Sequence, residues 1–385
     1  MMEIYLDHAA TTPLREEVLA EMLPYFSEEF GNASSIYGWG RRARQALGSA
    51  RDRVAQILNA KPDEIVFTSG GSEGANLAVK GAAWARQQRG KHIITSAVEH
   101  PAVLDAVLWL ERSGFAVTIL PVDGEGTVTP EAVRAALRPD TILVSIMHAN
   151  NEVGTIQPIS KIGEIVRGRG VLFHTDAVQT AGILELDVKE LNVDLLSLSA
   201  HKLYGPKGVG ALYVRKGVRL DPLIHGGAQE KRRRAGTENV AGIVGLAKAL
   251  ELAQAEREGE AERLTALRDR LLAGLREIPF TKVNGSLEHR LPNNVNICFR
   301  YIEGESLLLN LDLLGVAASS GSACTSGSLE PSHVLLAMGL SHEIAHGSLR
   351  LTLGRATSEG DVDFVLEKLP KIVERLRAMS PLYQV

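Results

Sequence analysis

The sequence predicts an α/β protein whose larger part is built on a mostly parallel β-sheet and whose smaller part is α+β. Two observations support this prediction. Up to about Val240, short apolar segments alternate with stretches of helical character. After Val240 the order changes, because one long amphipathic stretch is followed by shorter strand-like segments and a final helix.

The predicted strands of the larger part are short, rich in β-branched residues and apolar throughout rather than alternating. This pattern is typical of strands that are covered on both faces, as in a parallel sheet. The segments are 64–69, 92–97, 115–121, 141–148, 171–177 and 194–200. Helices are predicted between them, for example at 74–88 and 101–114. Ligands of such sheets bind at the carboxyl ends of the strands.

The smaller part opens with a long predicted helix at 239–278, whose charged half we expect to face solvent. It continues with strands at 293–299 and 347–353 and a last helix at 361–379 that contains a proline.

We expect two domains. A large α/β domain spans residues 15–255. A small α+β domain combines residues 1–14 with 256–385 and carries a polar loop at 319–328.

Composition narrows the class of protein. With 45% apolar residues, 23% charged residues and a net charge of -4, the chain is typical of a soluble globular protein and not of a nucleic-acid binder. No apolar run approaches the roughly 18 residues of a membrane span, and the acidic N-terminus does not resemble a signal peptide. Two cysteines fit a reducing cytoplasm. No metal site, nucleic-acid partner or membrane partner is predicted.

Polar groups follow several predicted strands. "TSGGSEG" (68–74) joins a strand to a helix, so its backbone N–H groups could hold a phosphate, although a plain tight turn is an equal alternative. His100 and Asp176 each follow a strand, where a histidine or carboxylate is more often a helix cap or a packed side chain. Lys202 ends the next apolar run, in "SLSAHKLYGP", where an ammonium is costly to desolvate unless it is paired or used.

One cofactor explains these residues together. Pyridoxal 5'-phosphate needs a lysine for its Schiff base, an acid that keeps its ring nitrogen protonated, and donors for its phosphate. We expect Lys202 to be the Schiff-base lysine, made nucleophilic by its apolar surroundings and by His201. Asp176 would pair with the ring nitrogen, and His100 would stack on the ring.

The motifs "YLDHAATTP", "FGNASS", "EIVFTSGGSE", "SIMHANNEVGTIQP", "HTDAVQTAG", "SAHKLYGPKGVGALYV", "RAGTENV", "SSGSACTSGSLEPSHVL" and "GSLRLTLGR" together resemble the cysteine desulfurases of group I, which are NifS/IscS-like members of the class V aminotransferase family. The resemblance runs from about residue 3 to the last helix. It implies the type I fold of pyridoxal-phosphate enzymes, with a seven-stranded type of sheet.

The resemblance also implies roles at matching positions. Gly71, Ser72, Ser199 and His201 would bind the phosphate, and Thr237 would reach the phosphate of the neighbouring subunit, so the active unit would be a homodimer. Near the ring, Gln179 would bond the ring hydroxyl oxygen and Asn151 would lie beside the substrate. Arg350 would bind the substrate carboxylate, a task that suits a guanidinium, with help from Asn32.

The two thiols have different surroundings. Cys298 lies in "VNICF", between apolar neighbours, and is predicted to be a packed core residue. Cys324 lies in "SSGSACTSGS", whose serines, glycines and threonine cannot build a core. We expect Cys324 to be the nucleophile that takes sulfur from L-cysteine, becomes a persulfide and leaves L-alanine. Its loop would then carry the sulfur to an acceptor, such as an iron-sulfur scaffold protein or a tRNA-thiolating enzyme.

Rival interpretations stay open at this point. A selenocysteine lyase would share these residues, and another enzyme of the class V aminotransferase fold, such as a serine or phosphoserine transaminase, would not need Cys324. A catalytically silent assembly partner would keep the fold for binding alone. The presence of Lys202, Asp176, His100 and Cys324 argues against the silent partner.

Overall fold

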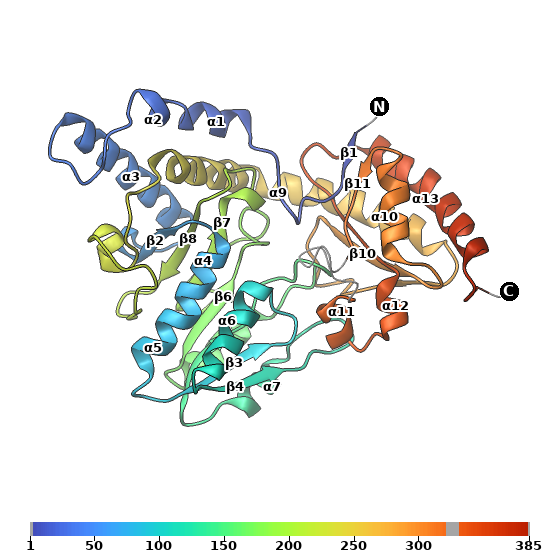
Figure 1. The fold of residues 1–385 in the computed structure, drawn as a ribbon, viewed down its shortest axis with the longest axis horizontal. Helices are drawn as coiled ribbons and strands as arrows, with labels where there is room; N and C mark the ends of the chain where they lie inside the picture. The colour runs from blue at the N-terminus through green and yellow to red at the C-terminus, as the bar shows by residue number, and fades with distance from the viewer. Residues whose placement is uncertain (1–2, 321–330, 384–385) are drawn as a thin grey trace.

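The computed structural model describes residues 3–320 and 331–383. Its larger part is a seven-stranded sheet with helices on both faces, and its smaller part lies beside one end of this layer (Figure 1). The strand order in the sheet is β2 (Ile65–Thr68), β8 (Gly210–Val214), β7 (Leu195–Ser199), β6 (Leu172–Asp176), β5 (Thr141–Ser145), β3 (His92–Ser96) and β4 (Ala116–Leu120).

The sheet is mostly parallel, as the sequence predicts. Only β8 runs against its neighbours β2 and β7, and the other adjacent pairs are parallel. The six predicted segments of the large part form β2 to β7, whereas β8 follows Lys202 and was not among them.

Helices cover the sheet on both faces. The helical elements before α9 are α1 (Glu16–Met22), α2 (Pro24–Ser27), α3 (Gly38–Ile57), the 3-10 turn Pro62–Glu64, α4 (Gly71–Asn76), α5 (Ala82–Arg86), α6 (Pro101–Arg112), α7 (Pro130–Ala136), α8 (Ile159–Arg167), and the 3-10 turns Ala200–Lys202 and Gln229–Arg232. A π-helical turn at Leu77–Gly81 joins α4 to α5, so the predicted helix at 74–88 is one interrupted helix.

Neighbouring residues of one strand enter opposite cores, which explains why these strands do not alternate in polarity. Ile93 packs in the core under α4, α5 and α6, while Ile94 packs in the core under α3, α8 and α9. Leu172 and Phe173 divide between the two cores in the same way.

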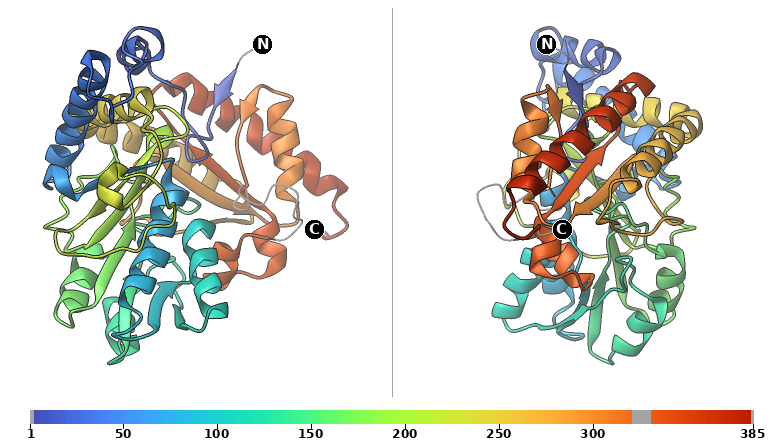
Figure 2. Two further views of the ribbon diagram at one scale, coloured as in Figure 1. Left: turned by 60° about the vertical axis from the view of Figure 1, so that its left-hand side comes forward. Right: turned by 90° about the vertical axis from the view of Figure 1, so that its right-hand side faces the viewer.

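The smaller part contains the end of the chain and its beginning. It comprises the second half of α9 (Val240–Arg276), the sheet β9 (Thr281–Val283), β10 (Asn294–Phe299) and β12 (Ser348–Thr352), the helices α10 (Gly304–Asp312), α11 (His333–Ala337), α12 (His342–His346) and α13 (Glu359–Met379), and the parallel pair β1 (Ile4–Tyr5) with β11 (Val316–Ala317). Figure 2 shows β1 lying among these orange and red C-terminal elements.

Helix α9 belongs to two cores. Its first turns, from Ile243 to Leu250, pack against the large sheet, and its last turns, from Leu264 to Leu275, pack with Ile4, Val295 and α13. The polar middle of α9 separates these two stretches, and the predicted domain boundary at residue 255 falls within it. Among the described residues, none of the helices combines the length and the apolar character that crossing a bilayer requires.

A buried carboxyl group links the end of β3 to the segment that follows β5. Glu99 follows β3 and is fully buried, and its Oε1 accepts hydrogen bonds from the Ser96 hydroxyl at 2.7 Å and from the Met147 amide at 2.9 Å. Burial raises the pKa of Glu99 to about 8, although these hydrogen bonds lower it.

This shift predicts a pH-dependent stability. In the unfolded chain Glu99 loses its proton near the ordinary pKa of 4.5, whereas in the folded chain it keeps it up to about pH 8. Between these values the folded state holds more protons, so the free energy of unfolding should fall as pH rises from about 5 to about 8. Glu99→Gln, which keeps the accepting oxygen but cannot ionise, should flatten this fall by a few (~2–4) kcal/mol.

Denaturant unfolding at pH 5.5 and pH 8 measures the difference. Glu111→Gln on the exposed side of α6 serves as the control and should leave the pH dependence unchanged. If the free energy of unfolding fell equally between pH 5.5 and pH 8 in wild type and in Glu99→Gln, Glu99 would not be the cause of the pH dependence.

Candidate active site

A cavity of about 330 Å³ opens at the carboxyl ends of the large sheet, where the fold class predicts a ligand. Most of the predicted site residues line it although they come from distant parts of the sequence: Gly71, Ser72, His100, Asn151, Asp176, Gln179, Ser199, His201, Lys202 and Arg350.

Asp176 and Lys202 come together because β6 and β7 are parallel neighbours. Asp176 is the last residue of β6, and Lys202 closes the 3-10 turn that follows β7. The ammonium of Lys202 donates to the carbonyl oxygens of Ala9 and Ala10, the latter at 2.6 Å. Asp176 is buried, which raises the pKa of its carboxyl group, while His100, the Val178 amide and Lys202 oppose that rise.

His100 is the N-cap of α6. Its Nδ1 accepts the Ala102 amide at 3.1 Å, so the neutral ring carries its proton on Nε2. Burial lowers the pKa of His100, against the attraction of Asp176. The ring is therefore predominantly neutral and has one N–H to donate.

The opposite wall is built for an anion. Gly70 adopts φ +155°, and a Cβ on Gly71 would lie 2.7 Å from the Val178 side chain, so the turn after β2 approaches the cavity closely only with glycines. The first amide groups of α4 and the hydroxyls of Ser72 and Ser199 lie at this wall. His201 adds no charge here, since burial and nearby Lys202 lower its pKa to about 4.

Arg350 on β12 supplies a buried positive charge on the side of the smaller part. Its Nη2 pairs with Asp7 at 2.8 Å and its Nη1 donates to the Asn151 carbonyl at 3.2 Å, while its Nε has no partner among the described residues. Two fixed partners hold the guanidinium in one orientation, which suits recognition of a carboxylate.

Sequence reasoning missed the role of the N-terminal segment, residues 7–12. The Ala9 carbonyl accepts from Lys202 and Gln179, and Thr12 donates its amide and hydroxyl to the His201 carbonyl. Asp7 holds Arg350 from the same segment. In the sequence, the motif "YLDHAATTP" indicates only the family resemblance, because the residue pattern of a loop does not predict which strand ends the loop will contact.

Two predicted residues lie outside the cavity, and a third lies outside the described residues. Asn32 does not lie with Arg350 in this chain: it is exposed between α2 and α3, in a separate surface hollow, and its side-chain oxygen accepts the Ser34 amide at 2.8 Å. Its predicted help to Arg350 therefore finds no support within one chain. Thr237 is exposed and does not line the cavity of its own chain, and Cys324 lies outside the described residues.

The other thiol is placed as predicted. Cys298 on β10 is fully buried, its sulfur accepts from the Asn284 side chain at 3.1 Å, and burial raises its pKa to about 11. The packed-core interpretation of Cys298 is confirmed.

The residues of the cavity fit pyridoxal phosphate. A carboxylate as buried as Asp176 requires a positive partner, which a protonated ring nitrogen provides. A lysine amine lies at the same cavity, and amide and hydroxyl donors for a phosphate line another wall. The volume of about 330 Å³ is in the range of small-molecule sites.

Comparisons with known proteins agree with this site. Residues 4–365 match the family model for aminotransferase class-V. A cysteine desulfurase IscS from Methanosarcina thermophila is 60% identical over 98% of this chain and 94% of its own length. Among solved structures, a NifS-like protein is 41% identical with a TM-score of 0.92, covering 97% of this chain and 100% of its own.

A further solved structure, titled SspA in complex with cysteine, is 40% identical with a TM-score of 0.82, covering 91% of this chain and 98% of its own. These similarities extend over nearly the whole chain and include the segments that build the cavity. The chain therefore belongs to the aminotransferase class-V family and, within it, to the pyridoxal-phosphate-dependent cysteine desulfurases.

Proposed function

We propose that this chain takes the sulfur of L-cysteine onto Cys324, releases L-alanine, and passes the persulfide to an acceptor protein. The observation that carries the proposal is the joint placement of Asp176, Lys202, His100 and Arg350 around one cavity. The structure titled as a complex with cysteine supports the choice of substrate.

The residues around the cavity divide the tasks of this scheme among them. Arg350, held by Asp7, orients the substrate carboxylate, and Asn151 lies beside it. When bound, pyridoxal phosphate supplies an electron-withdrawing ring that stabilises negative charge at the substrate Cα. Asp176 would hold the positive charge of the ring nitrogen, and Gln179 would donate to the ring hydroxyl oxygen.

Two side chains transfer protons in this scheme. Lys202 Nζ takes the Cα proton of the substrate, and His100 donates from Nε2. His100 would also pack against the cofactor ring. Gly71, Ser72, Ser199 and His201 hold the phosphate.

Cys324 performs the sulfur step. Its thiolate attacks the substrate sulfur, so an S–S bond forms while the Cβ–S bond breaks and its electron pair stays on the carbon. Two protons, one at Cβ and one at Cα, complete L-alanine. Overall, thiol plus L-cysteine gives persulfide plus L-alanine, and no outside oxidant or reductant is consumed.

The persulfide is then available to an acceptor, for which an iron-sulfur scaffold protein or a tRNA-thiolating enzyme is proposed. The composition of the chain, with two cysteines, supports a cytoplasmic location.

The sulfur step predicts the effect of Cys324→Ala. With L-cysteine and a reductant, wild type should release sulfide and alanine in equal amounts, whereas Cys324→Ala should lose about 100-fold or more of both because no thiolate attacks the sulfur. Visible absorbance of the bound cofactor should persist in the variant. Sulfide and alanine are measured in the same reaction.

Cys298→Ala is the matched control, since it removes the other thiol, and it should keep most of the activity. Undiminished release of sulfide and alanine by Cys324→Ala would contradict the scheme. Formation of a keto acid in place of alanine would also contradict it and would favour a transaminase. Turnover of L-selenocysteine alone would favour a selenocysteine lyase.

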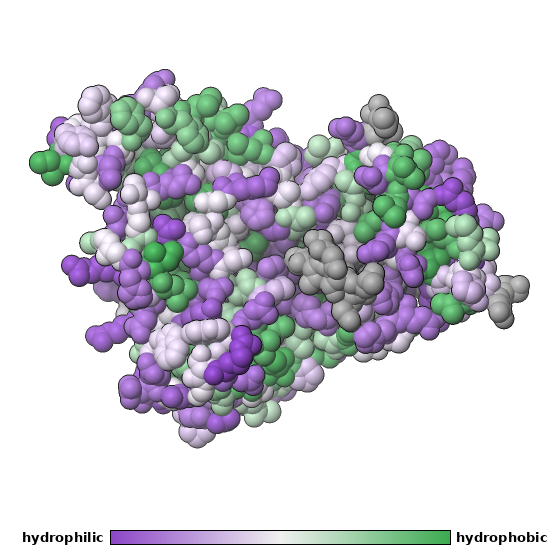
Figure 3. Space-filling model, viewed as in Figure 1, coloured by the Kyte–Doolittle hydropathy of each residue, from purple (hydrophilic) through white to green (hydrophobic). Residues whose placement is uncertain are grey.

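A homodimer is part of the proposal. Large apolar side chains are exposed along α1, α2 and the start of α3, namely Leu19, Leu23, Phe26, Phe30, Ile36, Tyr37 and Trp39. Figure 3 shows apolar surface gathered over α1 and α2. Such a patch is unusual on a monomer and fits a second copy of the chain, which would bring its Thr237 to the phosphate of this one.

Replacing the two phenylalanines of the patch tests the homodimer. Light scattering should give twice the chain mass of 41.5 kDa for wild type and a lower mass for Phe26→Ser combined with Phe30→Ser. Leu309→Ser, at an exposed apolar position on α10, should leave the mass unchanged. A wild-type mass of one chain would refute the homodimer.

A further inference from the structure

A second cavity lies beside Lys202. It measures about 70 Å³ and shares Lys202 and Gln179 with the active-site cavity. Its walls come from the N-terminal segment, from three further stretches at 179–183, 202–204 and 353–355, and from the middle of α9. We call this cavity the rear chamber. Lys202 and Gln179 therefore line both cavities, and the Lys202 amine and the Gln179 amide both donate to the Ala9 carbonyl.

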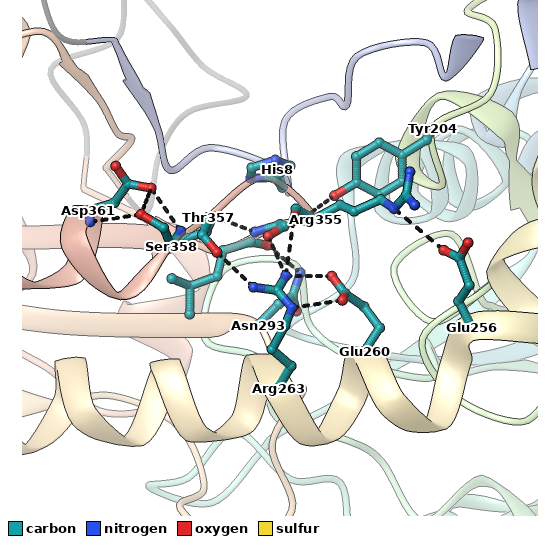
Figure 4. Close-up of polar contacts among 12 residues, drawn as sticks. His8, Tyr204, Glu256, Glu260, Arg263, Asn293, Arg355, Thr357, Ser358 and Asp361 are labelled. Carbon is teal, nitrogen blue, oxygen red and sulfur yellow. Dashed lines mark hydrogen bonds and ion pairs between the residues drawn. The ribbon is translucent and has the colours of Figure 1, made fainter. Parts of the chain in front are cut away.

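The charged groups around the rear chamber neutralise one another. Glu256 pairs with Arg15 at 2.8 Å and lies 3.5 Å from Arg355, and Glu260 pairs with Arg263 at 2.7 Å. Figure 4 shows Arg355 and Tyr204 facing Glu256, Glu260 and Arg263, which project from α9. Arg15 also pairs with Glu17 at 2.7 Å. The three guanidinium groups are therefore matched by three glutamates, and these pairs leave no excess charge to hold an anion or a metal cation.

One polar atom in the wall requires a neutral donor. Asn293 is buried, with 8% of its surface exposed, and its Nδ2 donates to the Leu353 carbonyl at 3.4 Å. Its Oδ1 is buried and has no partner among the described residues. A buried amide oxygen is almost always hydrogen-bonded, to protein or to ordered water.

The size of the rear chamber suits water. A volume of about 70 Å³ exceeds the ~15 Å³ that one water molecule needs, and polar groups line it. It is too small for a substrate amino acid together with its solvent. The wall residues Glu256 and Arg355 have side chains that are 41% and 46% exposed, so this wall reaches the protein surface.

We propose that the rear chamber holds water that exchanges protons with the Lys202 amine. The inference rests on the proposed role of Lys202 as the group that takes the Cα proton. In each exchange Nζ gives one proton to a water oxygen and receives another from it, so no charge or electron is gained or lost. A proton taken from the substrate is thus replaced by a solvent proton before alanine is completed, without water entering through the substrate cavity.

The fate of the Cα hydrogen tests the proposal. Holoenzyme is given L-cysteine deuterated at Cα in ordinary water, and the deuterium retained anywhere in alanine is measured by mass spectrometry. Alanine made by the wild-type enzyme should retain little deuterium. Ala253→Leu, which adds three carbon atoms to the wall of the rear chamber on α9, should retain several-fold more, because Lys202 then returns the original deuteron.

Ala255→Leu is the matched control: it makes the same change two residues away, at an exposed position of the same helix, and should behave as wild type. Equal retention in wild type and Ala253→Leu would overturn the proposal, as would high retention in wild type. Failure of the proposed function is distinguishable, since no alanine would form in any of these proteins.

A second variant tests for the water without turnover. Asn293→Leu keeps the side-chain size but removes the amide. If chamber water donates to Asn293 Oδ1, this variant should lower the thermal midpoint of the holoenzyme, because that water and the Leu353 carbonyl both lose a partner. An unchanged or raised midpoint would mean that no water donates to the amide oxygen of Asn293. This result would overturn the proposal even if Ala253→Leu failed to fold.

Discussion

The active site depends on the parallel pairing of β6 and β7. In this pairing Asp176 lies beside Ser197, so the strands end at the same edge of the sheet, and the turn after β7 carries Lys202 to the wall that Asp176 forms. A parallel sheet is covered on both faces, so its open edge is the place where polar groups can meet a ligand. A buried acid and a lysine amine at one such edge fit the partners that a pyridoxal ring needs.

The N-terminal segment completes this edge. It connects the Lys202 turn to β12 of the smaller part. Thr12 and Ala9 form hydrogen bonds with His201 and Lys202. Asp7, in the same segment, forms an ion pair with Arg350 on β12. The group proposed to act on Cα and the group proposed to orient the carboxylate are thus both held by one short stretch of backbone. Such preorganisation keeps reacting groups within the small tolerances that catalysis requires.

Local composition was enough to predict the central strands and two key residues. An apolar strand that ends in Asp176, and another followed by Lys202, point to chemistry because neither charge is stable there without a partner. Contacts between distant loops could not be predicted in this way, because the bonds from Ala9 to Lys202 and from Asp7 to Arg350 join residues 193 and 343 positions apart. Asn32 illustrates the same limit, since sequence motifs carry residue types but no distances.

The covalent bond between the cofactor and Lys202 is the central claim. Borohydride reduction of the holoenzyme, followed by digestion and mass mapping of the pyridoxyl label, tests it most directly. We predict a single labelled peptide, with the label on Lys202. A label on Lys207, the exposed lysine that follows in the same loop, or on any other residue would contradict the assignment.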